Sequence, residues 1–275
     1  MIAKTKKYTM FYPLILSRHP SHGVIRRKNR VLPLLPFRSV VRLGSTTVLE
    51  DNRVECNSVE AVQNSANKLK MKRCFDALDV RTAVWLKGEM STIEDIVALG
   101  FPLVVKHIFG SRGTGNYLVR RQEELETILQ GKTLSNYIFE KFYNYSREYR
   151  LHVTEDGCFY TCRKMLKTDT DPEDRWFRND SNSVWIVEEN ENFDKPVNWD
   201  LCVSESIKAL KAVGLDVGAV DLRIQSRLNN KEIVREDPDF IIVEINSAPS
   251  FGEITAQKYT EEIPKILKRK FIANV

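Results

Sequence analysis

Two segments near the C-terminal end alternate polar and apolar residues with a period of two. In residues 239–246 this period puts Glu244 and Asn246 on one face of a strand, because successive side chains of a strand point to opposite faces. Residues 218–224 put Asp221 and Arg223 on one face in the same way. The opposite faces are apolar and consist of Ile241, Val243 and Ile245 in one segment and Val220, Leu222 and Ile224 in the other. The pattern predicts two strands of a sheet with one polar and one apolar side.

If the two strands are neighbours, the side chains of Asp221, Glu244 and Asn246 converge. Two carboxylates and an amide oxygen are hard ligands that suit Mg²⁺, which proteins usually hold through few side chains together with phosphate oxygens. The period alone favours a plainer interpretation, in which the polar side faces water. Other parts of the chain must decide between a metal site and a solvated face.

A lysine stands directly before a glycine-rich segment. Lys106 ends the apolar run at 103–105, and residues 110–115 read Gly-Ser-Arg-Gly-Thr-Gly. Glycines let backbone N–H groups approach a phosphate closely, and a lysine at the end of a buried strand supplies a point charge. No Gly-Lys-Ser or Gly-Lys-Thr ends the segment, so it is not a Walker motif. An ordinary hairpin loop explains it equally well.

A third signal is an apolar run at 137–142 that ends in the pair Glu140–Lys141 and is followed by Glu148. Such a strand could hold a nucleoside, with backbone groups contacting the edge of the base. Glu148 would then accept hydrogen bonds from ribose hydroxyls. Taken alone, a polar strand end with surface ion pairs is the better explanation.

The remaining pattern mixes helices and strands without an internal repeat. Asn57 and Glu60 resemble a capping box at the start of a helix with apolar positions at 62, 66, 69 and 78. Ser91 with Glu94 predicts the start of a second, short helix that ends at Gly100. The other expected elements are strands at 82–86, 103–106, 117–119 and 137–142, a hairpin over 149–166, a polar loop at 167–183, helices at 122–129, 201–213 and 255–271, and weaker strands at 12–16, 31–35 and 40–43.

Charge is distributed unevenly along the chain. Residues 1–49 contain ten Lys or Arg and no Asp or Glu, whereas the rest has 32 basic and 37 acidic residues. A basic segment can attract an anionic partner such as a nucleic acid or an acidic peptide, or it can pack against the acidic remainder. Nucleic acid is the less expected partner, because the segment carries no recognisable nucleic-acid-binding motif.

Length and composition exclude several classes of protein. A chain of 275 residues suggests one to two domains, and 42% hydrophobic with 29% charged residues is typical of globular proteins. No run of 18 apolar residues predicts a membrane span, and no small-residue cleavage site follows the basic and apolar start. The five cysteines lack two pairs with metal-ligand spacing, so we expect no zinc site but reduced thiols in a cytoplasmic protein.

The order of these signals resembles the ATP-grasp superfamily, and within it the RimK-like and D-alanine–D-alanine-ligase-like carboxylate–amine ligases. The resemblance covers about residues 57–255 and rests on four short phrases in family order: Asn67-Lys-Leu69, Phe101-Pro-Leu-Val-Val-Lys106, Phe139-Glu-Lys-Phe142 and Val243-Glu-Ile-Asn-Ser-Ala-Pro249. Two positions depart from the family pattern. Ser250 stands where the family usually has Gly, and His107 stands where Pro often follows the strand lysine.

The resemblance implies an α+β ATP-grasp fold in which two lobes clamp ATP. A short, reduced N-terminal domain is expected at 1–56, an N-lobe at 57–142, and a C-lobe with the metal site at 143–275. The implied activity joins a carboxylate to an amine through an acyl phosphate and releases ADP and phosphate. The expected product is an amino acid or peptide joined to a peptide or protein. The alternative is an inactive ATP-grasp relic, or a protein that binds nucleic acid or another partner through its basic N-terminal segment.

Roles for single residues follow from the resemblance too. The expected ATP-binding residues are Lys68 and Lys106 at the phosphates, Ser111, Gly113 and Gly115 in a mobile lid, Glu140 with the backbone of Lys141 and Phe142 at the adenine, and Glu148 at the ribose. Arg178 is expected near the transferred phosphate, as the catalytic residue. Asp221, Glu244 and Asn246 are expected to hold Mg²⁺, with Mn²⁺ as an alternative ion. The expected partners are ATP and the carboxylate and amine substrates, with an acidic peptide or protein as one candidate and no membrane.

Overall fold

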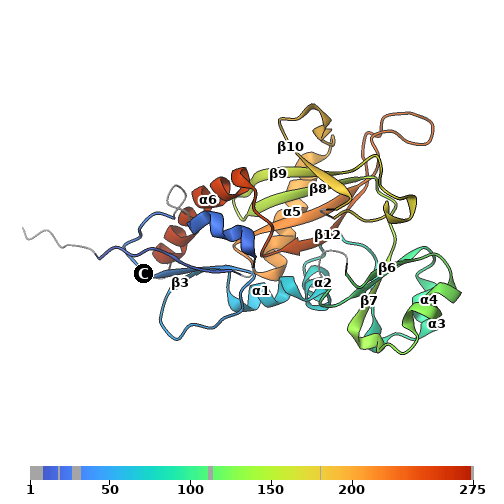
Figure 1. Ribbon diagram of the computed structural model, residues 1–275, viewed down its shortest axis with the longest axis horizontal. Coiled ribbons are helices and arrows are strands. Elements are labelled where there is room, and N and C mark those ends of the chain that lie inside the picture. The colour runs from blue at the N-terminus through green and yellow to red at the C-terminus, as the bar shows by residue number, and fades with distance from the viewer. Residues whose placement is uncertain (1–8, 18, 27–31, 111–113, 180, 274–275) are drawn as a thin grey trace, which may run out of the picture.

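Three separate sheets organise the protein in a computed structural model, which describes residues 9–17, 19–26, 32–110, 114–179 and 181–273 (Figure 1). The central sheet has five antiparallel strands, and its neighbours in space are often far apart in the sequence. Their order is β10 (Ser183–Val187), β9 (Gly157–Leu166), β8 (Arg147–Thr154), β11 (Val217–Ile224) and β12 (Phe240–Asn246). The predicted hairpin and the two late strands are confirmed, and the late strands are neighbours.

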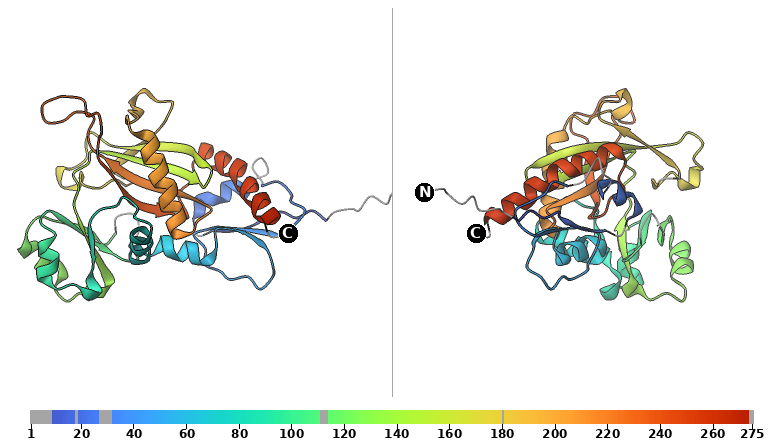
Figure 2. Two further views of the ribbon diagram at one scale, coloured as in Figure 1. Left: turned by 180° about the vertical axis from the view of Figure 1, so that it is seen from behind. Right: turned by 60° about the vertical axis from the view of Figure 1, so that its left-hand side comes forward.

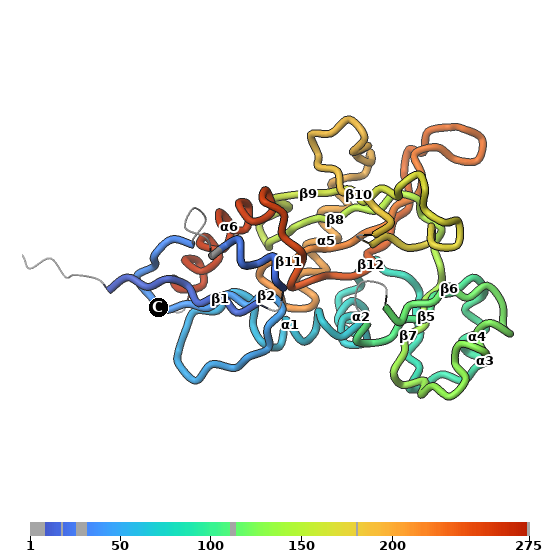
Figure 3. The backbone as a smooth tube through the Cα atoms, viewed as in Figure 1, coloured from blue at the N-terminus to red at the C-terminus, as the bar shows by residue number. Residues whose placement is uncertain are grey.

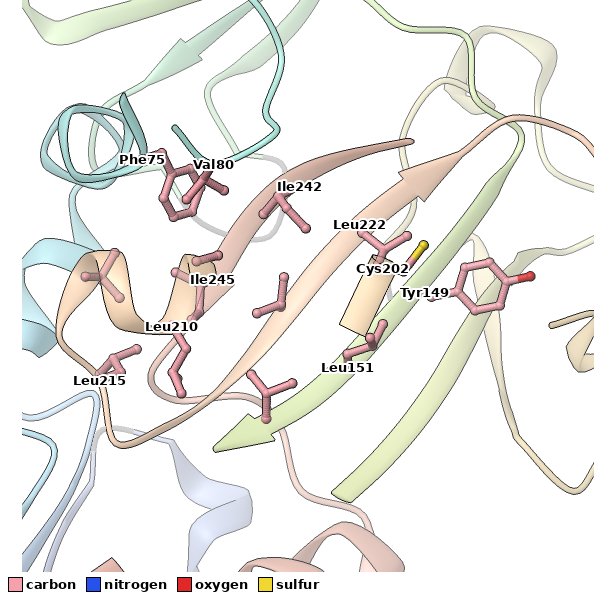
Figure 4. Close-up of a cluster of buried hydrophobic side chains, with 14 of the residues drawn as sticks. Phe75, Val80, Tyr149, Leu151, Cys202, Leu210, Leu215, Leu222, Ile242 and Ile245 are labelled. Atoms are coloured by element: carbon pink, nitrogen blue, oxygen red, sulfur yellow. The ribbon is translucent and has the colours of Figure 1, made fainter. Parts of the chain in front are cut away.

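One face of the central sheet is covered by three helices: α5 (Trp199–Val213), α1 (Val59–Ala66) and α2 (Lys68–Ala77). Val220, Leu222 and Ile224 lie in this core, as their spacing predicts, together with Leu210 and Phe75 (Figure 4). Helix α5 ends at Gly214, whose φ of +79° suits glycine. Figure 2 shows α5 lying along this face of the sheet from behind. Burial of this apolar side leaves the polar residues of the same strands on the opposite face.

A second, four-stranded antiparallel sheet forms a separate lobe. Its strands, in spatial order, are β4 (Trp85–Lys87), β7 (Tyr137–Lys141), β5 (Leu103–His107) and β6 (Asn116–Val119). Helices α3 (Ile93–Ala98) and α4 (Gln122–Leu129) pack on it around a core that includes Ile96, Leu125 and Phe139. Figure 3 shows the chain entering this lobe after α2 and leaving it towards β8.

A third, parallel sheet contains β1 (Leu14–Ser17), β2 (Ser39–Leu43) and β3 (Val54–Cys56). It shares a core with the C-terminal helix α6 (Glu253–Ala273) and with one end of the central sheet at Val217. Short 3₁₀ helices complete the fold: η1 (Pro20–Arg26), η2 (Gly88–Met90), η3 (Leu134–Asn136), η4 (Pro172–Asp174) and η5 (Glu191–Phe193). None of the helices in the described ranges is long and apolar enough to cross a membrane.

The two hydrophobic cores show which helices pack with which sheet. Helices α1 and α2 contribute Val62, Met71 and Phe75 to the core of the central sheet, whereas the core of the four-stranded lobe draws on residues 86–139. The division at 56/57 and 142/143 groups these two helices with the four-stranded sheet instead. The domain boundaries remain a prediction.

The helix expected from Asn57 to residue 78 is interrupted at Asn67. Ser58, not Asn57, caps α1, and Asn67 has extended dihedral angles and accepts a hydrogen bond from the Lys70 N–H. Asparagine favours such local hydrogen bonds over a helix interior, so α2 begins anew at Lys68. The second predicted cap is also displaced by one residue, since Thr92 and Asp95 form the capping box of α3.

A β-bulge corrects the predicted faces of β12. Glu244 pairs with Asp221 and Ile242 pairs with Leu222, so Val243 is an extra residue between the two pairs. Ile242 therefore joins Ile245 in the core, and Ile241 lies on the same side as the polar residues. Such a bulge shifts the side-chain alternation by one residue. The alternation assumed from the sequence holds only from Glu244 onwards.

Candidate active site

Charged and amide side chains from four adjacent strands cover the face of the central sheet opposite α5. We call them the polar face: Glu148 and Arg150 in β8, Lys164 in β9, Asp221 and Arg223 in β11, and Glu244 and Asn246 in β12. Asp221 lies at the centre, because its register partners are Arg150 on one side and Glu244 on the other. Residues that are paired across a sheet project to the same side, so the register brings these groups together.

Asp221 is buried and accepts two hydrogen bonds from one guanidinium group. Arg150 donates from Nε at 2.6 Å and from Nη2 at 2.7 Å, and Lys164 Nζ lies 3.4 Å from the same carboxylate. Burial alone would raise the pKa of Asp221, but these two cations hold that pKa well below its usual range. Asp221 is therefore an ionised carboxylate, and neither Arg150 nor Lys164 was singled out from the sequence.

Glu148 occupies the neighbouring position and is surrounded by cations. Arg223 Nε donates to it at 2.8 Å, Lys164 Nζ lies at 3.2 Å and Arg178 Nη1 at 3.6 Å. Burial alone would raise the pKa of Glu148, but these three cations lower it. A ribose hydroxyl would have to share this carboxylate with its cationic partners. The ribose-binding role remains a prediction.

Arg178 extends from the polar loop into this cluster, and its side chain is only 6% exposed. It donates to the backbone carbonyl of Ser146, and burial lowers its pKa to about 10. Its Nε is buried without a hydrogen-bond partner among the described residues. A buried donor without a partner is costly and fits a site that receives an anionic group.

Glu244 and Asn246 complete the predicted metal site. Asn246 Nδ2 donates to Glu244 Oε1 at 3.1 Å, and Glu244 is the cross-strand neighbour of Asp221. No group of three His, Cys, Asp or Glu residues that could hold a metal occurs in the described ranges, so this site depends on the Asn246 amide. The three oxygen-bearing side chains fit Mg²⁺ chemically, and a carboxylate has about four lone-pair sites to share between cations and a metal.

A buried lysine cluster lies between the four-stranded lobe and α2. Glu140 in β7 pairs with Lys106 at 2.5 Å and with Lys72 at 3.0 Å. Burial alone would raise the pKa of Glu140, but the two ammonium groups lower it to about 2. Lys72 also donates to Thr82 Oγ1, which in turn donates to the carbonyl of Ile242 in β12. Sequence reasoning missed Lys72, although it lies four residues after Lys68 and therefore on the same face of the helix.

Lys68, the first residue of α2, is directed at the glycine-rich loop. Its ammonium group donates to the Gly110 carbonyl, and its backbone N–H donates to Ile108. Burial lowers the pKa of Lys68, which the nearby charge of Glu244 partly opposes. Gly115 has a φ of +74°, at the point where the loop rejoins β6. Ser111 and Gly113 lie outside the described residues.

Two backbone N–H groups of the segment predicted to hold adenine, residues 140–142, already donate hydrogen bonds within the four-stranded lobe. The N–H of Lys141 donates to the Val84 carbonyl at 2.9 Å, and that of Phe142 donates to Pro102 at 3.2 Å. These two donors are used within the four-stranded lobe. An adenine ring here would have to use other backbone groups of this segment.

The polar face, Arg178 and the lysine cluster form an electropositive site. It contains seven basic side chains (Lys68, Lys72, Lys106, Arg150, Lys164, Arg178 and Arg223) and four carboxylates (Glu140, Glu148, Asp221 and Glu244). This net excess of cations, together with oxygen ligands for a metal, can bind and neutralise a polyphosphate.

Comparisons with known proteins bear on the family and the fold of the chain. Residues 66–169 match the RimK-like ATP-grasp domain family. D-alanine–D-alanine ligase from Bacillus anthracis has a similar structure, with 17% identity, a TM-score of 0.56, and 78% of this chain and 72% of that chain covered. Carboxyaminoimidazole ribonucleotide synthase from Aspergillus clavatus, complexed with ATP, gives 18% identity, a TM-score of 0.61, and 84% and 60% coverage. Biotin carboxylase from Campylobacter jejuni gives 15% identity, a TM-score of 0.59, and 84% and 54% coverage.

These identities show a shared fold, and the chain spans 60% of the synthase and 54% of the carboxylase. No curated protein sequence gives a significant match. The α+β fold predicted from the sequence is confirmed by the structural similarity. The family match over residues 66–169 and the shared fold together support the ATP-grasp superfamily for this chain.

Proposed function

We propose that the protein is an ATP-dependent carboxylate–amine ligase that works through an acyl phosphate. The observation that carries the proposal is the polar face, where Asp221, Glu244 and Asn246 adjoin buried cations in an ATP-grasp fold. An inactive relic has no need to keep both the oxygen ligands and the cations. The alternative of a pure binding protein therefore explains less of the site.

In this proposal the nucleotide lies between the central sheet and the four-stranded lobe. Lys68 and Lys106 bind its phosphates, and the loop at 110–115 covers them. Glu140 and the backbone of Lys141 and Phe142 line the adenine site, through groups other than the two N–H donors that are already bonded within the lobe. The contact of Lys68 with the Gly110 carbonyl supports the phosphate role, because it joins the lysine to the loop. The pairing of Glu140 with Lys72 and Lys106 supports an indirect role for that carboxylate, which fixes Lys106 in place.

Asp221, Glu244 and Asn246 would hold Mg²⁺, or Mn²⁺ in its place. A divalent ion here would neutralise phosphate oxygens and stabilise charge on the transferred group. Because Asp221 is ionised and buried, the protein already provides one ligand in the protonation state that a metal needs.

The chemistry consists of two substitutions. An oxygen of the substrate carboxylate attacks the γ-phosphorus of ATP, and the bond to the β,γ-bridging oxygen breaks, giving an acyl phosphate and ADP. The amine then attacks the acyl carbon, the C–N bond forms and phosphate leaves, while the amine loses a proton. Arg178, with Arg150 and Lys164 nearby, stabilises negative charge during both steps. The protein supplies position and charge and needs no nucleophile of its own.

Product analysis tests this proposal. The purified protein is incubated with ATP, Mg²⁺, and panels of amino acids and of acidic, neutral and basic peptides as carboxylate and amine donors. We expect ADP and phosphate, formed only when both a carboxylate and an amine are present. AMP and pyrophosphate, or no nucleotide turnover with any pair, would contradict the proposal.

An acidic peptide or protein remains our candidate substrate, because of the basic residues in the first 49 positions. The five cysteines, all free thiols, support a reducing cytoplasmic environment.

A further inference from the structure

The indole ring of Trp185 lies against the two cations that contact Asp221. Trp185 in β10 is the register partner of Lys164 in β9. Its ring centroid lies 4.7 Å from the Arg150 guanidinium carbon and 4.8 Å from Lys164 Nζ. Both distances fall within the range of about 6 Å over which a cation is attracted to an aromatic face, and Trp is the strongest such partner.

Arg150 depends on this ring more than Lys164 does. Arg150 donates two hydrogen bonds to Asp221, and its guanidinium group lies over the Trp185 ring. Lys164 has Glu148 as an additional partner at 3.2 Å. If Asp221 takes up a metal, its oxygens are shared and its hold on Arg150 weakens. The ring is then the contact that keeps the guanidinium group over the sheet.

We propose that Trp185 is a positioning residue, which keeps Arg150 and Lys164 on the polar face when Mg²⁺–ATP engages Asp221. This inference rests on the proposed function. Trp185 acts through the two cations, which then remain close to the transferred phosphoryl group. Its contribution should therefore be larger for the transition state than for bound ATP.

A structural role for Trp185 must be separated from an electrostatic one. The ring is half-buried on β10, an edge strand of the sheet, so its bulk also covers neighbouring side chains. Tryptophan analogues with one to four ring fluorines, placed at position 185 alone, keep the shape of the ring while they reduce the negative potential of its face. A role of the bulk alone predicts no trend along this series.

Calorimetry on the full chain gives the first readout, with two nucleotide probes. Mg²⁺–ADP with tetrafluoroaluminate mimics the phosphoryl group in transfer, and Mg²⁺–AMP-PNP mimics bound ATP. Along the series we expect affinity for the first probe to fall stepwise, by about tenfold in total, because two desolvated cation–π contacts are weakened. Affinity for the second should change by less than about twofold. Val184→Ala, on the opposite face of the same strand, serves as the control and should leave both affinities unchanged.

A second readout needs no nucleotide. Hydrogen exchange at the Arg150 Nε–H, followed by NMR in the nucleotide-free protein, should accelerate with each added fluorine, because the guanidinium group is held less firmly. If the natural protein binds neither probe, the proposed function is wrong and the role of Trp185 in nucleotide engagement falls with it, and the exchange series then shows only whether the ring holds Arg150. If the natural protein binds both probes but affinity and exchange stay flat along the series, the inference about Trp185 is wrong and the proposed function stands.

Discussion

At the scale of single residues, Asp221 and Glu148 on the polar face form ion pairs, whereas Glu244 has no cation within ion-pair distance among the described side chains. Glu244 accepts a hydrogen bond from Asn246 and neighbours Asp221. Glutamine at this position would keep the size and the hydrogen bonding of the side chain but lose its charge. The fold should therefore tolerate the change.

We predict that Glu244→Gln lowers ATP turnover by about 100-fold or more, because metal-assisted charge stabilisation is worth several kcal/mol. Thermal unfolding without nucleotide should stay close to that of the natural chain. Glu189→Gln, just beyond the end of β10, is the matched control and should retain activity. Unchanged turnover and Mg²⁺ dependence in Glu244→Gln would remove this residue from the metal site.

A second residue-scale prediction concerns pH. His152 is buried beside Tyr259, and burial, with a smaller effect of Arg150, lowers its pKa to about 3. Between pH 6.5 and 3 the unfolded chain binds a proton at this histidine that the folded protein does not bind, so stability falls as the pH falls through this window.

From pH 6.5 to 5 this group alone should lower the free energy of unfolding by about 2 kcal/mol, at about 1.4 kcal/mol per pH unit. Urea unfolding of the natural chain and of His152→Gln at several pH values measures the effect. His152→Gln should have a flatter pH dependence in this window, whatever its absolute stability. Parallel curves would show that His152 is protonated in the folded state.

At the scale of elements, the glycine-rich loop depends on Gly110. A Cβ at this position would lie 2.4 Å from the backbone oxygen of Thr114, which cannot yield without moving the loop. We predict that Gly110→Ala reduces the rise in melting temperature caused by Mg²⁺–ATP, since a ligand stabilises only the state that binds it. Gly23→Ala, where a Cβ has open space, should show the full rise. An equal rise in both variants would place the nucleotide away from this loop.

The helices and strands also show which parts of the fold the sequence patterns can predict. The alternation in 218–224 and the hairpin at 149–166 were predictable because each has one apolar face or a clear turn. Asn67 was predicted to lie within a helix because the apolar spacing continues past it. In the structure it ends α1, and its side chain caps the start of α2. Strand β10 was not predicted: it begins at Ser183, where the predicted polar loop ends. The position of Trp185 was missed as well, because no local pattern links it to Lys164.

The candidate site was predictable only where a local pattern in the sequence marks its residues. Asp221, Glu244 and Asn246 could be grouped from period and motif order. Arg150 and Lys164 could not, because their place beside Asp221 depends on the register between strands that are far apart in the sequence.

At the scale of the whole molecule, one ion pair joins the four-stranded lobe to the central lobe, and further ion pairs lie within the N-terminal segment. Arg120 in the four-stranded lobe pairs with Glu173 in the polar loop of the central lobe at 2.8 Å. In the N-terminal segment, Arg38 and Arg42 pair with Asp51 and Glu55. The side chains of the other eight basic residues before position 50 lie outside the described part of the structure.

We predict that capture of an acidic peptide substrate weakens as salt rises from about 0.05 to 0.5 M, because exposed charges are screened within about 10 Å at 0.1 M. Apparent affinity and melting temperature should be measured in parallel at each salt concentration. If the basic segment instead packs against the acidic lobes, rising salt should change the melting temperature and leave the apparent affinity for the peptide unchanged. Equal use of neutral or basic peptides, with no effect of salt on capture, would contradict the prediction.

The central claim is that a substrate carboxylate attacks the γ-phosphorus of ATP on the polar face. The most direct measurement uses a carboxylate substrate labelled with ¹⁸O in both oxygens, chosen from the pairs that support ADP formation. If an acyl phosphate forms, amide formation must transfer one ¹⁸O to each phosphate released, as mass spectrometry of the phosphate will show. Unlabelled phosphate, or ¹⁸O recovered in AMP, would contradict the account.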